Sequence, residues 1–163
     1  MSDNGEDDAL PGGGSFHTAE KAPHILRFSC INLNGITPST VQDTIQHTLE
    51  SQIDLQGYSE VNLDTMKPEN RIALQENTTK MDPAAKSIWG TSILPSPSNF
   101  KPGGTAIVAF SRSASRVKKT GMDPLGRWTY VILSAQGNKE ILLISIYQCC
   151  PKPSNAVGNT AYH

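Results

Sequence analysis

The sequence predicts a mixed α/β domain in which helices cover a largely antiparallel or mixed sheet. Its first half alternates segments with strand and helix periodicity, an order that is typical of α/β architectures. Its second half carries consecutive strand-like segments, and the last two are separated only by "QGNK", which predicts a tight hairpin. A length of 163 residues favours one domain with a sizeable core.

The first strand and helix follow from the spacing of apolar residues. Residues 25–31, "ILRFSCI", form a mostly apolar run, which predicts a buried strand. A helix is predicted over residues 39–52, where Ser39 or Thr40 can cap the first turn. The buried face of this helix is expected to consist of Val41, Ile45, Thr48 and Leu49.

The middle of the chain predicts a second strand, a second helix and a third strand. Residues 53–61 are expected to form the strand, and residues 67–80 the helix, since Pro68 suits a first turn. The composition of residues 96–104 predicts a loop. Residues 103–111 then form a third strand that begins with two glycines.

The hairpin near the carboxyl end is the clearest element. Strands are predicted over residues 127–135 and 140–147, and Gly137 in the turn can adopt a positive φ. Side chains alternate along both strands at strand spacing, and we expect Trp128 to lie in the core.

Three segments are expected along the chain. Residues 1–22 are acidic and glycine-rich, a composition that predicts a disordered tail. Residues 23–151 form the folded part, and residues 152–163 form an irregular end.

Composition limits the classes of function. The chain has 14 basic and 15 acidic residues, so a nucleic-acid substrate would need a local basic patch. Three cysteines without metal-ligand spacing argue against a disulfide scaffold and favour a reducing, intracellular compartment. No apolar run is long enough to cross a membrane, and no obligate protein partner is evident.

Polar side chains follow three of the predicted strands. Asn32 and Asn34 come after the first strand, Glu60 after the second and Tyr147 after the last. Such positions are the usual site in layered α/β domains. A carboxylate there can bind Mg²⁺, and amide or phenol groups can donate hydrogen bonds to a phosphate. Taken singly, each also suits a surface charge, a turn residue or ordinary packing.

Four segments in order carry a resemblance to a known family. They are "FSCINLNG", "IDLQGYSEVNLD", "GGTAIVAF" and "GRWTYVIL" followed by "KEILLISIY". Over about residues 24–151 the chain resembles the endonuclease/exonuclease/phosphatase superfamily. It is most similar to the endonuclease domains that precede reverse transcriptases in non-LTR-type retroelements. The resemblance implies the amino-terminal half of a four-layer α-β-β-α sandwich, and therefore an incomplete one.

The resemblance also implies roles for individual residues. Asn32 would lie near the scissile phosphate, and Asn34 beside the metal. Glu60 would be the Mg²⁺ ligand and Tyr147 the active-site tyrosine. The implied reaction is Mg²⁺-dependent hydrolysis of a phosphodiester in DNA, with a nuclear location by analogy with retroelements.

The sequence departs from the family pattern in three places. Ser59 stands where the family usually has glutamine before the glutamate, and "QCCP" replaces the usual proline and asparagine after Tyr147. The family's Gly-Asp-x-Asn and Asp-His motifs are absent from the 163 residues. We therefore expect a truncated domain with little or no activity, uncovered apolar surface and an unpaired sheet edge.

Several alternatives stay open. A basic cluster that includes Arg116, Lys118 and Lys119 can contact a nucleic-acid backbone, or it can be a solvated loop. The chain can instead be a phosphatase or sphingomyelinase relative that acts on a small phosphoester. It can also be a non-catalytic binding module or a degenerate pseudogene product.

Overall fold

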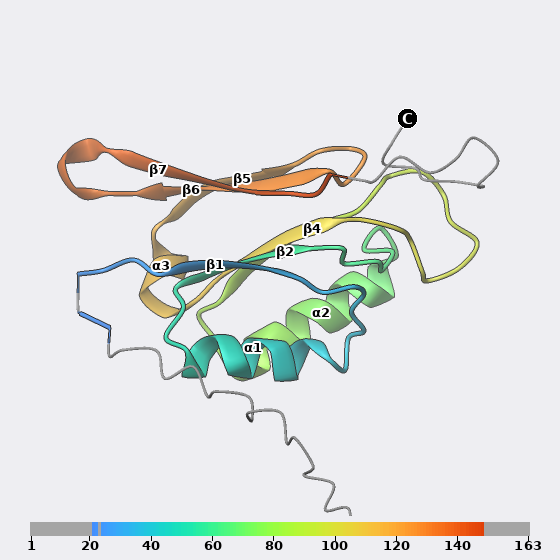
Figure 1. The fold of residues 1–163 in the computed structure, drawn as a ribbon, viewed down its shortest axis with the longest axis horizontal. Coiled ribbons are helices and arrows are strands. Elements are labelled where there is room, and N and C mark those ends of the chain that lie inside the picture. The colour runs from blue at the N-terminus through green and yellow to red at the C-terminus, as the bar shows by residue number, and fades with distance from the viewer. Residues whose placement is uncertain (1–20, 23, 149–163) are drawn as a thin grey trace, which may run out of the picture.

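The protein is organised in three layers, two of sheet and one of helices (Figure 1). The structure is a computed structural model that describes residues 21–22 and 24–148. The predicted irregular end and residues 1–20 of the predicted tail lie outside the described residues.

The first sheet has four strands in the order β1-β2-β4-β3. Their bounds are β1 Phe28–Asn32, β2 Leu55–Ser59, β3 Lys86–Gly90 and β4 Thr105–Ala109. Only β1 and β2 are parallel, with Asn32 opposite Ser59, whereas β4 runs antiparallel to both of its neighbours. Because parallel strands end at the same edge, the residues that follow β1 and β2 emerge side by side.

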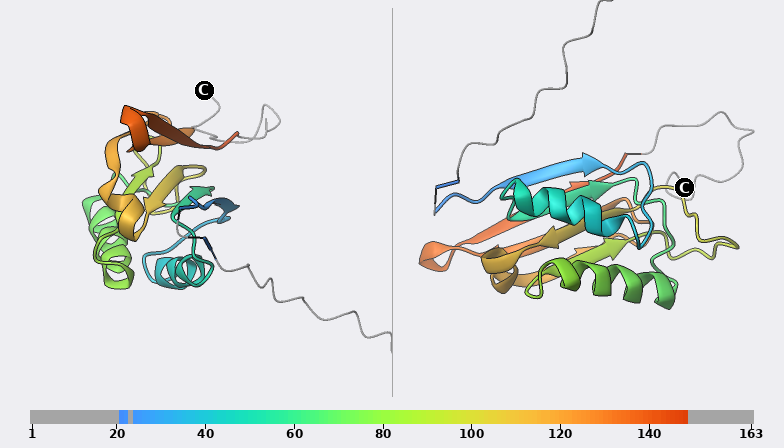
Figure 2. Two further views of the ribbon diagram at one scale, coloured as in Figure 1. Left: turned by 90° about the vertical axis from the view of Figure 1, so that its left-hand side faces the viewer. Right: turned by 90° about the horizontal axis from the view of Figure 1, so that it is seen from below.

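Two helices cover one face of this sheet, as the turned views show (Figure 2). Helix α1 spans Val41–Glu50 and helix α2 spans Pro68–Met81, with the proline in the first turn as predicted. Thr40 is the N-cap of α1, but its side chain makes no capping hydrogen bond. The buried residues of α1 are Val41, Ile45 and Thr48, which confirms the predicted face.

A second sheet packs on the other face of the first (Figure 1). It is an antiparallel meander of β5 Val117–Met122, β6 Trp128–Ser134 and β7 Glu140–Ile146. A short helix, α3 Ser111–Ser115, connects it to β4. The turn between β6 and β7 contains Gly137 at a φ of 67°, as the hairpin pattern predicted.

Glycines allow the two sheets to approach closely. A Cβ built on Gly57 would lie 3.2 Å from Cys30 Sγ and 3.4 Å from Ser145 Oγ, and one built on Gly90 would lie 2.9 Å from Thr129 Cγ2. The Ser145 hydroxyl, 1% exposed as a residue, donates a 2.9 Å hydrogen bond to the carbonyl of Tyr58. This bond ties the end of β7 to the end of β2.

The first strand differs from its prediction in burial. It was expected to be buried, but β1 is an edge strand, and Phe28 and Ile31 are 39% and 41% exposed. The strands β3 and β5 were not predicted. Of the basic cluster, for which a solvated loop was one interpretation, Arg116 directly follows α3, and Lys118 and Lys119 lie in the first half of β5.

The outer face of the second sheet is apolar and exposed. Leu142, Ile144 and Ile146 are 55%, 44% and 65% exposed, and Trp128, expected in the core, is 36% exposed. Within the part of the chain that the structure describes, no helix lies on this face (Figure 1). Among residues 21–22 and 24–148, no helix is long and apolar enough to cross a membrane.

Candidate functional site

Three strands end at one edge of the sandwich, which we call the strand-end site. Asn32 pairs with Ser59, and Ser59 pairs with Thr105, so β1 and β2 end together beside the start of β4. The Ser145 hydrogen bond brings the end of β7 to the same edge. The structure therefore gathers there the polar residues that follow these strands, which are Asn32, Asn34, Glu60 and Tyr147.

The two asparagines form a tight turn after β1. Asn32 Oδ1 accepts a 2.8 Å hydrogen bond from the backbone N–H of Asn34, and Asn34 has a φ of 48°. This bond fixes the orientation of the Asn32 amide and leaves its NH₂ group available as a donor. Both residues are exposed, so a ligand can reach them.

Glu60 lies directly after β2 in a left-handed backbone conformation, with a φ of 52°. A non-glycine residue with positive φ is uncommon, and such backbone strain is concentrated at functional sites. Its carbonyl accepts a 2.8 Å hydrogen bond from Gly35 N–H, which links it to the turn after β1.

The Glu60 side chain is suited to bind a cation. Among the described residues, its half-buried carboxylate makes no hydrogen bond and no ion pair. Mg²⁺ prefers oxygen ligands and often binds proteins through one or two carboxylates. No group of three or more His, Cys, Asp or Glu side chains in the described ranges could hold a metal. A metal held by Glu60 would therefore take further ligands from outside such a group, for example from water.

Asn62 is a further residue of the site that the sequence did not single out. Its φ is 52°, and its Oδ1 accepts a 2.7 Å hydrogen bond from Gly103 N–H. Its own N–H donates to the Gly103 carbonyl at 2.8 Å. These bonds dock the segment after β2 on the glycine pair before β4. A Cβ on Gly104 would lie 2.6 Å from Thr91 Cγ2, so this approach requires glycine.

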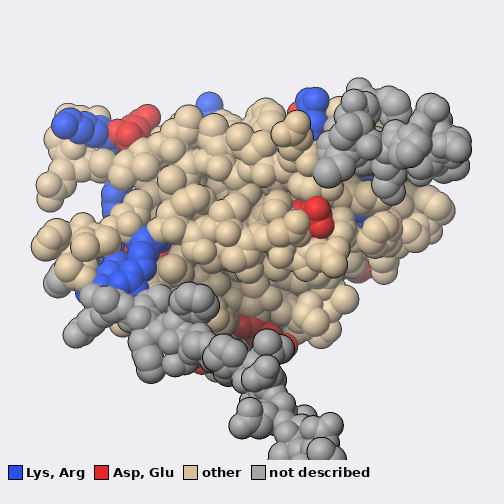
Figure 3. All heavy atoms as spheres, in the orientation of Figure 1, with Lys and Arg blue, Asp and Glu red and all other residues tan. Residues whose placement is uncertain are grey.

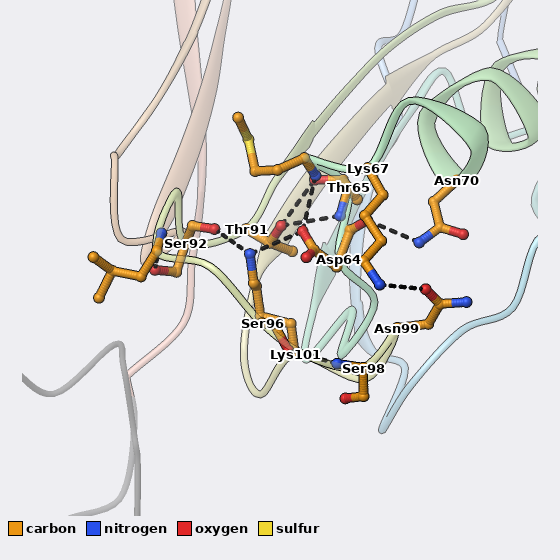
Figure 4. A network of polar contacts seen from close by, with 12 residues as sticks. Asp64, Thr65, Lys67, Asn70, Thr91, Ser92, Ser96, Ser98, Asn99 and Lys101 are labelled. Atoms are coloured by element: carbon orange, nitrogen blue, oxygen red, sulfur yellow. Dashed lines mark hydrogen bonds and ion pairs between the residues drawn. The ribbon is translucent and has the colours of Figure 1, made fainter.

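A buried ion pair supports the same segment (Figure 4). Lys101 Nζ lies 2.8 Å from Asp64 Oδ1 and donates a 2.7 Å hydrogen bond to the Ser92 carbonyl. The two charged side chains are only 3% and 5% exposed. The network holds the loop that precedes β4 against the backbone that carries Glu60. The sequence placed Lys101 in a loop without any sign of burial.

Tyr147 is held by the turn between β5 and β6. Its backbone N–H donates a 2.8 Å hydrogen bond to the Arg127 carbonyl. In that turn, Asp123 accepts hydrogen bonds from Arg127 Nε at 2.8 Å and from another guanidinium nitrogen at 3.0 Å. These bonds lower the pKa of the Asp123 carboxyl, although burial opposes them.

The basic residues that the sequence offers as contacts to a nucleic-acid backbone do not belong to the strand-end site. Arg116 follows α3, and its Nε donates a 2.9 Å hydrogen bond to the Ser134 carbonyl at the end of β6. Lys118 pairs with Glu140 at 2.6 Å, with both side chains about half exposed. Lys119 follows in β5. The contacts of Arg116 and Lys118 with Ser134 and Glu140 place these two residues at the end of the β6–β7 hairpin away from the strand-end site.

Comparison with known proteins supports a fold relationship. No protein-family model matches the sequence, and no curated protein matches it. Among solved structures, an AP endonuclease from Leishmania major aligns with a TM-score of 0.54 and 12% identity. The alignment covers 75% of this chain and 40% of that one. A 3′ phosphatase from Neisseria, bound to a product DNA hairpin, aligns with a TM-score of 0.46 and 19% identity. That alignment covers 76% of this chain and 41% of the phosphatase.

At these identities the likeness concerns the fold and not the activity. The chain spans about two fifths of the length of each of these proteins. The described residues thus adopt a mixed α/β sandwich of the endonuclease/exonuclease/phosphatase type, with two mainly antiparallel sheets.

Proposed function

We propose that this chain is part of a Mg²⁺-dependent hydrolase that cleaves phosphodiester bonds in DNA. The observation that carries the proposal is the strand-end site, where the ends of β1, β2 and β7, which precede or carry Asn32, Asn34, Glu60 and Tyr147, lie at one edge. The fold shared with an AP endonuclease adds support by analogy.

Each residue of the site has a chemical role in this proposal. Glu60, with the amide oxygen of Asn34, would hold Mg²⁺, which neutralises charge on phosphoryl oxygens and lowers the pKa of water. The Asn32 NH₂ group, oriented by the bond to Asn34 N–H, would donate to a phosphate oxygen. The Tyr147 hydroxyl would donate to the same phosphate.

Three finer proposals rest on the sequence. The likeness of the motifs to retroelement endonucleases is the ground for proposing a retroelement origin and a nuclear location. None of the four histidines follows an aspartate, and Gly-Asp-x-Asn is absent. We therefore expect slow turnover by this chain alone, since loss of a general base typically costs about 10²–10⁴ in rate.

A second candidate function is hydrolysis of a small phosphoester. It is favoured by the position of Arg116 and Lys118, which contact Ser134 and Glu140 at the end of the β6–β7 hairpin away from the strand-end site. Extended DNA requires basic contacts along its backbone, whereas a small ester does not.

The test compares two substrates. The full chain is incubated with supercoiled plasmid DNA or with bis(4-nitrophenyl) phosphate, with and without Mg²⁺. We expect slow, Mg²⁺-dependent nicking of the plasmid that Glu60→Gln reduces at least about tenfold. Glu76→Gln, an exposed residue on α2, removes the same charge and should leave the rate unchanged. Cleavage of the small ester alone would favour the second candidate, and equal rates in Glu60→Gln would overturn both.

A further inference from the structure

A large cleft lies at the end of the sandwich opposite the strand-end site. Its volume is about 1030 Å³, and it is lined by residues 21–22, 24–26, 49, 52–54, 110–113, 115–116 and 134–136. Beside α3 in Figure 3, Lys and Arg atoms gather on the left of the molecule. This volume is near the upper end of the range of small-molecule pockets, roughly 300–1,000 Å³.

The charges in the cleft are unbalanced. Lys21, Arg112 and Arg116 contribute positive charge, and Asp54 is the acid among the lining residues. Asp54 is already matched, because Lys21 forms an ion pair with it and Arg27 N–H donates to it at 2.7 Å. The two arginines are therefore left without a counter-charge from the cleft, although the whole chain has a formal net charge of −1.

The guanidinium groups of Arg112 and Arg116 have N–H donors that no described residue uses. Arg112 is exposed, and within the described ranges its side chain makes no hydrogen bond or ion pair. Arg116, which also lines the cleft, uses Nε on the Ser134 carbonyl, so its two terminal NH₂ groups remain available as donors. Paired N–H donors of this kind match the oxygens of a phosphate group.

The rest of the lining is partly apolar. Ile25, 50% exposed, and the half-buried Leu26 and Ile53 contribute apolar surface to the lining. A free phosphate ion would leave this surface uncovered, whereas an organic phosphate would bury it.

We propose that this cleft binds a phosphate monoester with an apolar or aromatic body of nucleotide size. Arg112 and Arg116 hold the phosphate, and the body lies against Ile25 and Ile53. The cleft is separate from the strand-end site and does not depend on Glu60 or on a metal.

The test is calorimetric titration of the full chain with adenosine 5′-monophosphate in the presence of EDTA, which prevents metal-bridged binding elsewhere. We expect saturable binding, stronger than that of inorganic phosphate. Arg112→Ala should weaken it at least about tenfold, the effect of losing a hydrogen bond to a charged group. Because the Arg112 side chain has no partner among the described residues, the thermal unfolding midpoint of the Arg112→Ala protein should equal that of the unmodified chain.

Two further variants serve as controls for the titration. Arg71→Ala removes an equally exposed arginine from α2 and should bind like the unmodified chain. Glu60→Gln should also bind normally. Absence of saturable binding, unchanged affinity in Arg112→Ala, or a loss of affinity in Glu60→Gln would overturn the proposal.

Discussion

Lys101 shows how much of the strand-end site depends on single buried contacts. Its charge lies 2.8 Å from Asp64, with both side chains nearly inaccessible to water, and its backbone N–H donates to the Asn62 carbonyl at 3.2 Å. Burial of one charge without its partner is costly, because the protein interior cannot replace water as a solvent.

Lys101→Met should therefore lower the free energy of unfolding by about 3–5 kcal/mol, since it leaves the Asp64 carboxylate buried and unpaired. The double variant Lys101→Met/Asp64→Leu should recover much of this loss. Urea denaturation of the three proteins measures both effects. If the double variant were less stable than the single one, the ion pair would not explain the cost, and this comparison holds even if the single variant is largely unfolded.

At the same scale, the sequence could predict some of the site but not all of it. Asn34 precedes Gly35, and Asn-Gly is a known turn signal, so its positive φ could be foreseen. The positive φ of Glu60 and Asn62 could not. Both residues lie in a segment held by distant partners: the Glu60 carbonyl accepts from Gly35 N–H, and Asn62 exchanges hydrogen bonds with Gly103, some forty residues further along the chain.

At the scale of elements, the turn between β5 and β6 links stability to pH. Asp123 accepts hydrogen bonds from Arg127 and from the backbone N–H of Leu125, and its pKa in the folded protein is lowered. A carboxyl whose pKa is lower in the folded state stabilises the fold above its unfolded pKa, which is about 3.9. This contribution is lost as the pH falls through the folded pKa.

Asp123→Asn should therefore reduce stability at pH 7 by about 1–3 kcal/mol, the usual effect of losing hydrogen bonds to a charged group. The difference between the two proteins should shrink as the pH falls below about 4. Chemical denaturation at a series of pH values measures it. A difference that stayed constant down to the lowest pH would contradict the assigned role of the carboxylate charge.

The helices and the hairpin were predictable because their signals are local. The face of α1, Pro68 at the start of α2 and Gly137 in the turn need only neighbouring residues. The strands β3 and β5 contain Lys, Ser and Gly and have weak strand signals. They form because β4 and β6 provide pairing partners, and such partners are not visible in a local pattern.

At the scale of the whole molecule, the sequence predicted a mixed α/β sandwich, which the structure confirms, whereas the roles of the residues after its strands stay a prediction. The alternation of strands and helices was sufficient for the fold class, but the parallel pairing that makes β1 and β2 end together is seen only in the structure. The position of the basic cluster was not predictable, since it depends on the direction in which the second sheet crosses the first. The exposed face of Leu142, Ile144 and Ile146 agrees with the expected uncovered surface.

The central claim is that Glu60 and its neighbours at the strand ends form a metal site. The most direct measurement is a Mg²⁺ titration of the ¹⁵N-labelled full chain, followed by amide chemical shifts. We predict saturable shifts concentrated at Asn34, Gly35 and Glu60 that Glu60→Gln abolishes and Glu76→Gln preserves. Absence of shifts at these amides, or the same shifts in Glu60→Gln, would contradict the claim.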